Sequence, residues 1–419
     1  MELNVTRTIS QLISAIAYAL DMDDGTKLYH AWRVSILGSE LAALLSPKER
    51  KEVFYGCLLH DIGGIGLPDH IVNYLRKEGI PVEPAVLTHP LSGAEIVVQV
   101  PGLETVANFI LNHHEWCNGR GYPLGRHQGE IPQGAQIVGI CDCIDIIIRN
   151  MAVPTRENAL TALKQRPSGQ FSPELIAGAA KVLENRHLFD EMTDEKRIGE
   201  LFKRVREETG DMTIPVGVDA IGITCEVFSQ LIDAKHPYTI GHAKRVSRSS
   251  LLTALAMGMS HDELTKIKWA GLLHDVGKLG TPRKLLDKTG PLTPDEYEVV
   301  KRHIVYTKEI LETIIDFKEI ALIAASDHER YDGKGYPQGL KGDQIPLGAK
   351  IIAVADSFDA MTSDRSYRKA MDIDEASNEI MNNSGTQFDP RVSKEALPIL
   401  RSLNLARNSL LKQQAGGKT

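Results

Sequence analysis

The sequence predicts an all-α protein made of two tandem helical bundles joined by a connecting helix. Three observations favour this fold class. At 419 residues the chain exceeds the size at which one hydrophobic core keeps growing, so two domains are expected. One set of histidines and carboxylates occurs twice at a constant separation of 214 residues. Helix-start signals precede the His-Asp pair of each set.

The expected organisation has four parts. These are an N-terminal domain over residues 1–189, a helical linker over 190–215, a C-terminal domain over 216–405 and a frayed tail over 406–419. The linker is charged and favours helix, and its apolar residues recur with loose periodicity. The tail ends in glycine and polar residues, which is typical of a frayed terminus.

Each His-Asp pair is expected at the buried end of a helix. Ser46-Pro47-Lys48-Glu49 combines a capping serine, a proline at the first helical position and a closing glutamate, and Ser260-His261-Asp262-Glu263 is its counterpart. The pairs His60-Asp61 and His274-Asp275 follow fourteen residues after these caps. A glycine comes soon after each pair and favours the end of the helix.

Further helices are predicted to carry the other repeated residues. Thr293-Pro294-Asp295-Glu296 is a capping box that starts a helix bearing His303, the counterpart of His89. The apolar runs 137–148 and 351–361 carry Asp142 and Asp356. The β-branched residues of the first run would also suit a buried strand, but its length and lack of alternation favour a helix.

Bulk composition excludes several classes of protein. The chain is 42% hydrophobic and 25% charged without a long apolar run, so no membrane span is expected. Its start lacks the features of a secretory signal, which indicates a cytoplasmic protein. A formal charge of −7 gives no general attraction to DNA or RNA and favours a small anionic substrate. The five cysteines form no CxxC pair and are expected to be reduced.

The second copy holds the candidate catalytic centre. Imidazole and carboxylate ligands without thiolate suit manganese, iron, cobalt, nickel or zinc. Seven ligands are too many for one ion and suit two ions bridged by a carboxylate and a water, which is then activated as the nucleophile. Asp275 is the predicted bridge. The seven candidates are His242, His274, Asp275, His303, Asp327, His328 and Asp356.

Lys278 follows Asp275 by three residues and is placed to meet a phosphate oxygen as a point charge. The alternative is a solvated lysine in a turn. We assign the catalytic role to Asp275, Lys278 and His274.

Several long motifs of the second copy resemble the HD-GYP family, a branch of the HD phosphohydrolases. The resemblance covers about residues 220 to 400. It implies a helical bundle, a site with two or three metal ions, and cleavage of cyclic di-GMP or 3',3'-cyclic GMP-AMP to the linear dinucleotide. The motifs are His274-Asp275-Val276-Gly277-Lys278, Asp327-His328-Glu329-Arg330, Gly335-Tyr336-Pro337, Asp356-Ser357-Phe358-Asp359 and Arg365-Ser366-Tyr367-Arg368.

The family pattern also implies roles for individual residues. One ion would be held by His242, His274, Asp275 and Asp356, and the other by Asp275, His303, Asp327 and His328. The family usually has two successive histidines where this copy has Asp327-His328, which leaves the metal open, with iron or manganese preferred over nickel, cobalt or zinc. Tyr238 stands where some members have a glutamate that resembles a third-metal ligand, so two ions are expected.

The resemblance further implies a substrate-binding set of Lys278, Gly335, Tyr336, Pro337, Arg365 and Arg368. The Tyr336 ring is expected to face a nucleobase, although such a loop is also typical of a surface turn packed on its own core. The two arginines resemble phosphate-facing arginines of the family. The alternative interpretation is that they are solvated charges on a helix.

The first copy repeats the metal ligands but not the substrate-binding residues. Its candidates are His30, His60, Asp61, His89, His113, His114 and Asp142. Gly64 stands in place of Lys278, Asn118 in place of Asp332, and the arginine segment has no clear counterpart. Three interpretations stay open: a second active site, a metal-loaded regulatory or ligand-sensing site, and a structural domain with core histidines. We favour a regulatory or weakly active half.

The sequence therefore predicts a metal-dependent phosphodiesterase that acts on a cyclic dinucleotide. The sequence favours cyclic di-GMP and 3',3'-cyclic GMP-AMP about equally as the substrate. One alternative is a receptor that binds the dinucleotide without useful catalysis, and another is an HD hydrolase of other nucleotides. No DNA, RNA or membrane partner is expected, and a homodimer is left open.

Overall fold

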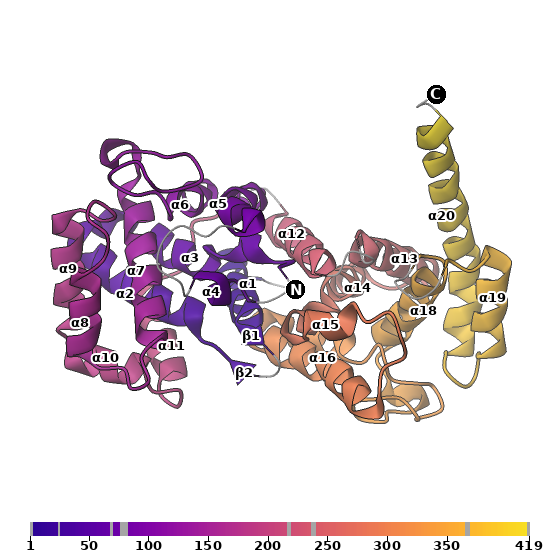
Figure 1. The fold of residues 1–419 in the computed structure, drawn as a ribbon. Helices are drawn as coiled ribbons and strands as arrows, with labels where there is room; N and C mark the ends of the chain where they lie inside the picture. Colours follow the sequence, from indigo (N-terminus) through magenta and orange to yellow (C-terminus); the bar gives the residue numbers. More distant parts are fainter. Residues whose placement is uncertain are drawn as a thin grey trace. The chain divides into compact units, whose positions relative to one another are not determined.

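A computed structural model describes residues 3–23, 26–67, 70–75, 83–215, 219–235, 240–364 and 369–416 of this chain. The chain divides into two compact units, Leu3–Val227 and Phe228–Thr419, here called the N-terminal and the C-terminal unit (Figure 1). Both are built from helices, and the described strands are one antiparallel pair of two residues each, β1 (Met22–Asp23) and β2 (Thr26–Lys27). The all-α prediction is confirmed.

The N-terminal unit contains eleven α-helices and three short 3₁₀ helices among its described residues. The α-helices are α1 (Val5–Leu20), α2 (His30–Leu45), α3 (Arg50–Leu59), α4 (Ile71–Leu75), α5 (Pro84–Val97), α6 (Glu104–Asn112), α7 (Gln133–Arg149), α8 (Arg156–Lys164), α9 (Pro173–Leu183), α10 (Arg186–Met192) and α11 (Ile198–Thr209). The 3₁₀ helices are η1 (Pro47–Glu49), η2 (Ile62–Gly64) and η3 (Gln128–Glu130).

The C-terminal unit repeats the order of the ligand-bearing helices. The boundary between the units falls within α12 (Ala220–Ala234). After it come α13 (His242–Ala256), α14 (His261–Leu273), η5 (Val276–Gly280), α15 (Arg283–Leu286), α16 (Pro294–Glu312), η6 (Ile315–Phe317), α17 (Lys318–Ala324), η7 (Gly342–Gln344), α18 (Leu347–Met361), α19 (Ile373–Asn382) and α20 (Pro390–Gly416). The last helix thus continues to Gly416, within the segment expected to be a tail.

Two of the three predicted capping boxes are confirmed. Ser260 caps α14 and Thr293 caps α16, each in a reciprocal arrangement with a glutamate three residues later. The prediction of a capping box at Ser46 is wrong. There the 3₁₀ helix η1 precedes α3, and the Ser46 hydroxyl donates to the Glu49 carboxylate at 2.7 Å instead of capping backbone N–H groups.

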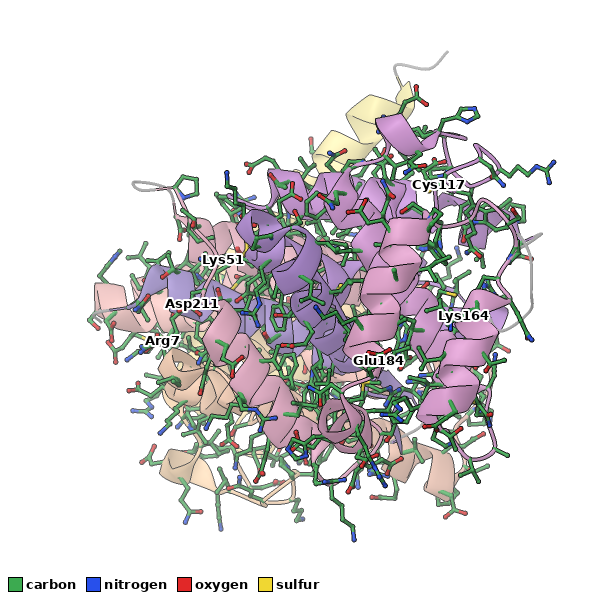
Figure 2. All side chains as sticks on the ribbon, turned by 90° about the vertical axis from the view of Figure 1, so that its left-hand side faces the viewer. Arg7, Lys51, Cys117, Lys164, Glu184 and Asp211 are labelled. Atoms are coloured by element: carbon green, nitrogen blue, oxygen red, sulfur yellow. The ribbon has the colours of Figure 1, made fainter. Side chains whose placement is uncertain are left out.

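In each unit the helix that begins with a predicted ligand packs against two other ligand-bearing helices. In the N-terminal unit α2 packs against α3 and α7, and in the C-terminal unit α13 packs against α14 and α18. The segment predicted as a linker contributes α11, whose Phe202 ring stacks on Trp32 of α2 at 4.6 Å and 5°. Lys164 on α8 and Glu184 at the end of α9 are exposed charged residues of the N-terminal unit (Figure 2).

The helix that follows each His-Asp pair comes unusually close to its neighbour. A Cβ atom at Gly277 of η5 would lie 1.9 Å from the carbonyl oxygen of His303 in α16, and one at Gly63 of η2 would lie 2.1 Å from that of His89 in α5. Only glycine fits at this distance. The Thr307 hydroxyl strengthens the junction, since it accepts from the Gly277 N–H and donates to the His274 carbonyl, both at 3.0 Å.

Across the described parts of the chain, no helix has the length and apolar character that a bilayer crossing requires.

Replacing Gly277 with alanine should destabilise the C-terminal unit. The added Cβ would overlap the His303 carbonyl at 1.9 Å and the Thr307 nitrogen at 2.6 Å, and both are backbone atoms that cannot move alone. We expect the free energy of unfolding to fall by about 3 kcal/mol, as measured by denaturant unfolding. Gly290→Ala is the matched control, because a Cβ there meets no atom within 4 Å. Equal effects of the two changes would refute the proposed close junction.

Candidate metal centre

Helix ends bring the predicted ligands of the N-terminal unit together. His30 is the first residue of α2, His60 and Asp61 follow α3, and His113 and His114 follow α6. His89 and Asp142 come from the interiors of α5 and α7. Seven side chains from five helices thus form two groups, His30 with His60 and Asp142, and Asp61 with His89, His113 and His114. The ligand atoms within each group lie within 4.8 Å of one another.

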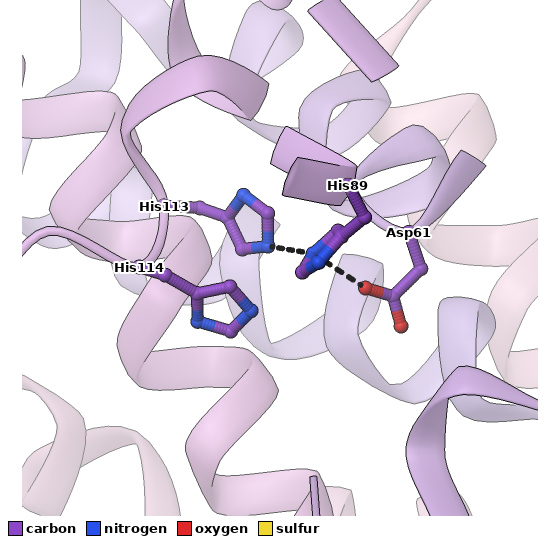
Figure 3. Close-up of side chains that lie close together, drawn as sticks. All are labelled: Asp61, His89, His113 and His114. Carbon is purple, nitrogen blue, oxygen red and sulfur yellow. Dashed lines mark hydrogen bonds and ion pairs between the residues drawn. The ribbon is translucent and has the colours of Figure 1, made fainter. Parts of the chain in front are cut away.

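Asp61 joins the two groups. Its Oδ2 lies 3.3 Å from Nε2 of His30 and 3.4 Å from Nε2 of His60, while its Oδ1 lies 3.4 Å from Nε2 of His89. Nε2 of His89 in turn lies 3.2 Å from Nε2 of His113 (Figure 3). One carboxylate with an oxygen toward each group is the arrangement required of a bridging ligand.

The second ring nitrogen fixes the tautomer of these imidazoles. Nδ1 of His60, His89 and His113 lies 2.8, 2.5 and 2.6 Å from the backbone carbonyl oxygen three residues earlier. A carbonyl can only accept, so Nδ1 carries the hydrogen and Nε2 offers its lone pair to the cluster. This second hydrogen bond is typical of metal-binding histidines.

The C-terminal unit places its predicted ligands at the corresponding positions of its helices. His242 begins α13, His274 follows α14, and Asp356 lies in α18, and these three form one group within 4.8 Å. Asp275 has Oδ2 at 3.5 Å from Nε2 of His274 and Oδ1 at 3.8 Å from Nε2 of His303. Asp275 therefore contacts imidazoles on both sides, as Asp61 does.

The second group of this unit is looser. The rings of His303 and His328 are perpendicular with centroids 5.3 Å apart, and Asp327 is buried nearby. Within the described residues these side chains do not form a group as compact as Asp61 with its three histidines. One physical reason is that the Asp327 side chain is shorter than the His113 imidazole at the equivalent position.

Protonation states differ among the C-terminal residues. Burial disfavours charge on Asp275, but His274 and Lys278 hold the pKa of its carboxyl group well below its usual range. Burial lowers the pKa of His303 to about 3, with Lys278 adding to the effect. Burial also raises the pKa of Asp327 to about 8. At neutral pH Asp275 is therefore ionised and His303 is neutral, and Asp327 holds a proton that a bound cation would displace.

A carboxylate behind each helix-start histidine was missed by the sequence analysis. Asp359 accepts from Nδ1 of His242 at 2.7 Å and from Nε of Arg245 at 2.6 Å. Asp145 accepts from Nδ1 of His30 at 2.6 Å and from Nε of Arg33. Both lie three residues after a predicted ligand, hence on the same helix face. Their recurrence in the two copies was the signal that could have revealed them.

The Gly-Tyr-Pro loops lie against the centres. Glu329 accepts from the backbone N–H groups of Gln338 and Leu340 at 2.7 and 2.9 Å, which fixes the loop. A Cβ atom at Gly335 would lie 2.3 Å from the Arg330 nitrogen, so glycine is required there. The Tyr336 ring stacks on His328 with centroids 5.0 Å apart. Pro337 follows Tyr336 through a cis peptide bond.

The N-terminal unit has an equivalent loop. Glu115 accepts from the N–H groups of Leu124 and Arg126 at 2.6 and 2.8 Å, and Tyr122 stacks on His114 at 4.7 Å.

The surroundings of the two bridging carboxylates differ. The Lys278 ammonium lies 2.6 Å from Oδ2 of Asp275. In the N-terminal unit Gly64 stands at this position, and a Cβ there would lie 2.7 Å from the Ile71 side chain, so an apolar group takes the space. The predicted substrate-binding residues Arg365 and Arg368, and also Tyr238, lie outside the described residues.

Buried polar atoms without a hydrogen-bond partner indicate whether these centres suit cations. Within the described structure both Asp327 oxygens and Nε2 of His274 and His303 are buried without a hydrogen-bond partner, and the same holds for both Asp61 oxygens. Leaving a buried polar group unsatisfied costs about 1–3 kcal/mol each. Imidazole nitrogens and carboxylate oxygens are also the donors that divalent transition metals accept. The residues present fit bound metal ions.

Comparisons with known proteins agree with this geometry. Two family models, each described as an HD domain, match residues 28–147 and 226–392. The 3'3'-cGAMP-specific phosphodiesterase 3 of Vibrio cholerae is 28% identical in an alignment that covers 94% of this chain and 96% of that protein. A cyclic di-GMP phosphodiesterase of Thermotoga maritima is 40% identical over 182 residues, 42% of this chain and 49% of that protein.

A solved structure is similar along nearly the whole chain. The crystal structure of a cyclic GMP-AMP-specific phosphodiesterase of Vibrio cholerae matches with a TM-score of 0.64 and 26% identity, covering 95% of this chain and 97% of the other. The two matched regions include all fourteen predicted metal ligands, seven in each. The chain therefore belongs to the HD-domain family and carries this domain twice.

Proposed function

We propose that this chain is a metal-dependent phosphodiesterase that hydrolyses a cyclic dinucleotide to the linear dinucleotide, and that the C-terminal unit performs the reaction. The contact between Lys278 and Asp275, at 2.6 Å, carries the proposal. It places an ammonium group beside a carboxylate that imidazoles approach from both sides. When bound, two divalent cations would lower the pKa of a water molecule and neutralise charge on the phosphodiester.

The side chains of the C-terminal unit have distinct tasks in this proposal. Asp275 would contact both cations, Lys278 would orient Asp275 and face an anionic phosphate oxygen, and Asp359 would hold the His242 ring. One cation would be held by His242, His274, Asp275 and Asp356, and the other by Asp275, His303, Asp327 and His328. The mixture of imidazole and carboxylate donors suits iron or manganese.

The N-terminal unit would hold cations with little turnover. Its two ligand groups are complete and compact, which supports metal binding. The position of Lys278 is Gly64 here, and the Ile71 side chain fills the adjacent space. A phosphodiester would therefore meet an apolar side chain where the other unit offers a cation. We assign this unit a regulatory role.

Two cyclic dinucleotides are the leading substrates. Two relatives that match across most of both chains bear the name 3'3'-cGAMP-specific phosphodiesterase, with 28% and 27% identity. The cyclic di-GMP phosphodiesterase of Thermotoga maritima matches less than half of this chain. We therefore place 3',3'-cyclic GMP-AMP first and cyclic di-GMP second.

Paired substitutions of the bridging carboxylates test the assignment of the two units. With Mn²⁺ or Fe²⁺ added, Asp275→Ala should lower hydrolysis of the preferred dinucleotide by about 10³-fold or more, because both cations lose a shared ligand. Asp61→Ala should keep turnover within about tenfold of the unchanged protein. Products are identified by mass. Loss of activity in Asp61→Ala with retention of activity in Asp275→Ala would reverse the assignment of the two units. If the unchanged protein hydrolyses neither dinucleotide, the proposal that it is a cyclic dinucleotide phosphodiesterase is wrong.

Asp359→Asn should weaken metal binding by the C-terminal unit. The amide can still contact Nδ1 of His242, but it lacks the charge that holds the imidazole and Arg245 in place. Loss of such an outer partner lowers metal affinity by about 10- to 100-fold. Calorimetric titration of the metal-stripped protein measures the effect, and a hydrolysis assay accompanies it.

Asp145→Asn is the matched variant in the N-terminal unit. It should weaken the other set of metal sites while leaving hydrolysis almost unchanged. If Asp359→Asn binds metal as tightly as the unchanged protein, the carboxylate has no role in holding the metal ligand.

A further inference from the structure

We propose that Tyr297, Lys301 and Tyr336 form a nucleobase-binding wall beside the C-terminal metal centre, with the Tyr297 ring stacking on a purine of the substrate. The proposal rests on the proposed function, because a nucleotide substrate is what would bring a base to this position. Tyr336 belongs to the predicted site, whereas Tyr297 and Lys301 lie outside every motif that the sequence analysis singled out.

The three side chains form a continuous series of contacts that starts at a metal ligand. The Tyr336 ring is nearly parallel to that of His328, at 10° with centroids 5.0 Å apart. The Lys301 ammonium lies 5.1 Å from the centroid of Tyr336 and 5.1 Å from that of Tyr297. Tyr297 is 46% exposed. The series therefore leads from the buried centre to an aromatic ring that a ligand can reach.

Lys301 is a positioning residue in this arrangement. Its ammonium contacts Glu298 at 2.7 Å, and its side chain is only 27% exposed. Tyr297 and Lys301 are four residues apart on α16, so they are neighbours on the helix surface. A cation held over two aromatic rings is attracted by both and limits their motion. The Tyr297 ring is thus held in place before a ligand arrives.

The N-terminal unit supplies an internal comparison. It repeats the seven ligands, the tyrosine that stacks on a histidine, and the glutamate that fixes the loop. At the positions of Tyr297 and Lys301 it has Glu83 and Leu87. A carboxylate repels an anionic dinucleotide, and leucine offers no cation to the rings. The wall is therefore confined to the unit that also has Lys278.

A base platform of this kind suits cyclic dinucleotides because every base has a face that can stack. Stacking of one base on one aromatic side chain tolerates different bases, so the wall would bind the guanine of cyclic di-GMP or either purine of 3',3'-cyclic GMP-AMP. It would contribute to affinity for the substrate and not to the chemical step. The expected effect of its loss is therefore on KM.

Steady-state kinetics of the full-length protein with Mn²⁺ test the wall. Tyr297→Leu should raise KM for 3',3'-cyclic GMP-AMP and cyclic di-GMP by about tenfold with kcat nearly unchanged. Tyr297→Phe should restore the KM of the unchanged protein, because it keeps the ring. Lys301→Gln should also raise KM, and Lys301→Arg should restore it. Lys308→Gln, on the same helix, is the control and should change neither constant.

Methyl p-nitrophenyl phosphate, a phosphodiester without a nucleobase, separates stacking from general damage. Its hydrolysis should be the same in all five variants. An unchanged KM for the dinucleotides in Tyr297→Leu, or an equal loss on the base-free substrate, would overturn the wall while leaving the proposed function in place. If the unchanged protein hydrolyses neither dinucleotide, the proposed function fails and this inference fails with it.

Discussion

The two centres depend on one hydrogen bond made by buried imidazoles. In both units, histidines at the centre donate Nδ1–H to the carbonyl three residues earlier, as His60 and His274 do at 2.8 and 3.0 Å. Nε2 of each ring therefore carries no hydrogen, and its lone pair points into the centre, where it can bind a cation. The bond is made by histidines that follow a helix end, as at His60, and by histidines inside a helix, as at His89. The helices that carry these histidines, and the glycines that let the segment after each His-Asp pair approach its neighbour, therefore set the geometry of the centre.

This dependence explains which features the sequence could predict. Helix ends have local signals, and a ligand set that recurs at constant spacing identifies the residues that must converge, so the all-α fold and the clustering of His242, His274 and Asp356 followed from the pattern. Asp359 was missed because a carboxylate on a helix resembles an ordinary solvated charge until its partner is known. The capping box predicted at Ser46 was wrong because the sequence of such a box does not distinguish the start of an α-helix from a 3₁₀ turn.

Metal binding and substrate binding have separate structural origins in this fold. The predicted ligands are buried or half-buried side chains at helix ends and on helix faces, and both units have such a set. The groups that distinguish the units, Lys278 and Lys301, are long side chains. The Lys278 ammonium lies beside Asp275, and the Lys301 ammonium lies over the Tyr336 ring. Replacing such a side chain does not disturb the helix ends. A duplicated domain could therefore lose side chains that would contact substrate and still keep those that would hold cations.

Charge balance links two of the differences between the units. Asp327 replaces the neutral imidazole of His113 with a carboxylate, and Lys278 replaces Gly64 with an ammonium group. Once a bound cation displaces the Asp327 proton, the added negative charge would lower the attraction of the centre for an anionic phosphodiester. Lys278 contributes one positive charge next to Asp275 and offsets it. The two exchanges together leave the net charge of the centre unchanged, so in the proposed site the C-terminal unit would gain an oxygen donor for a cation without losing its attraction for phosphate.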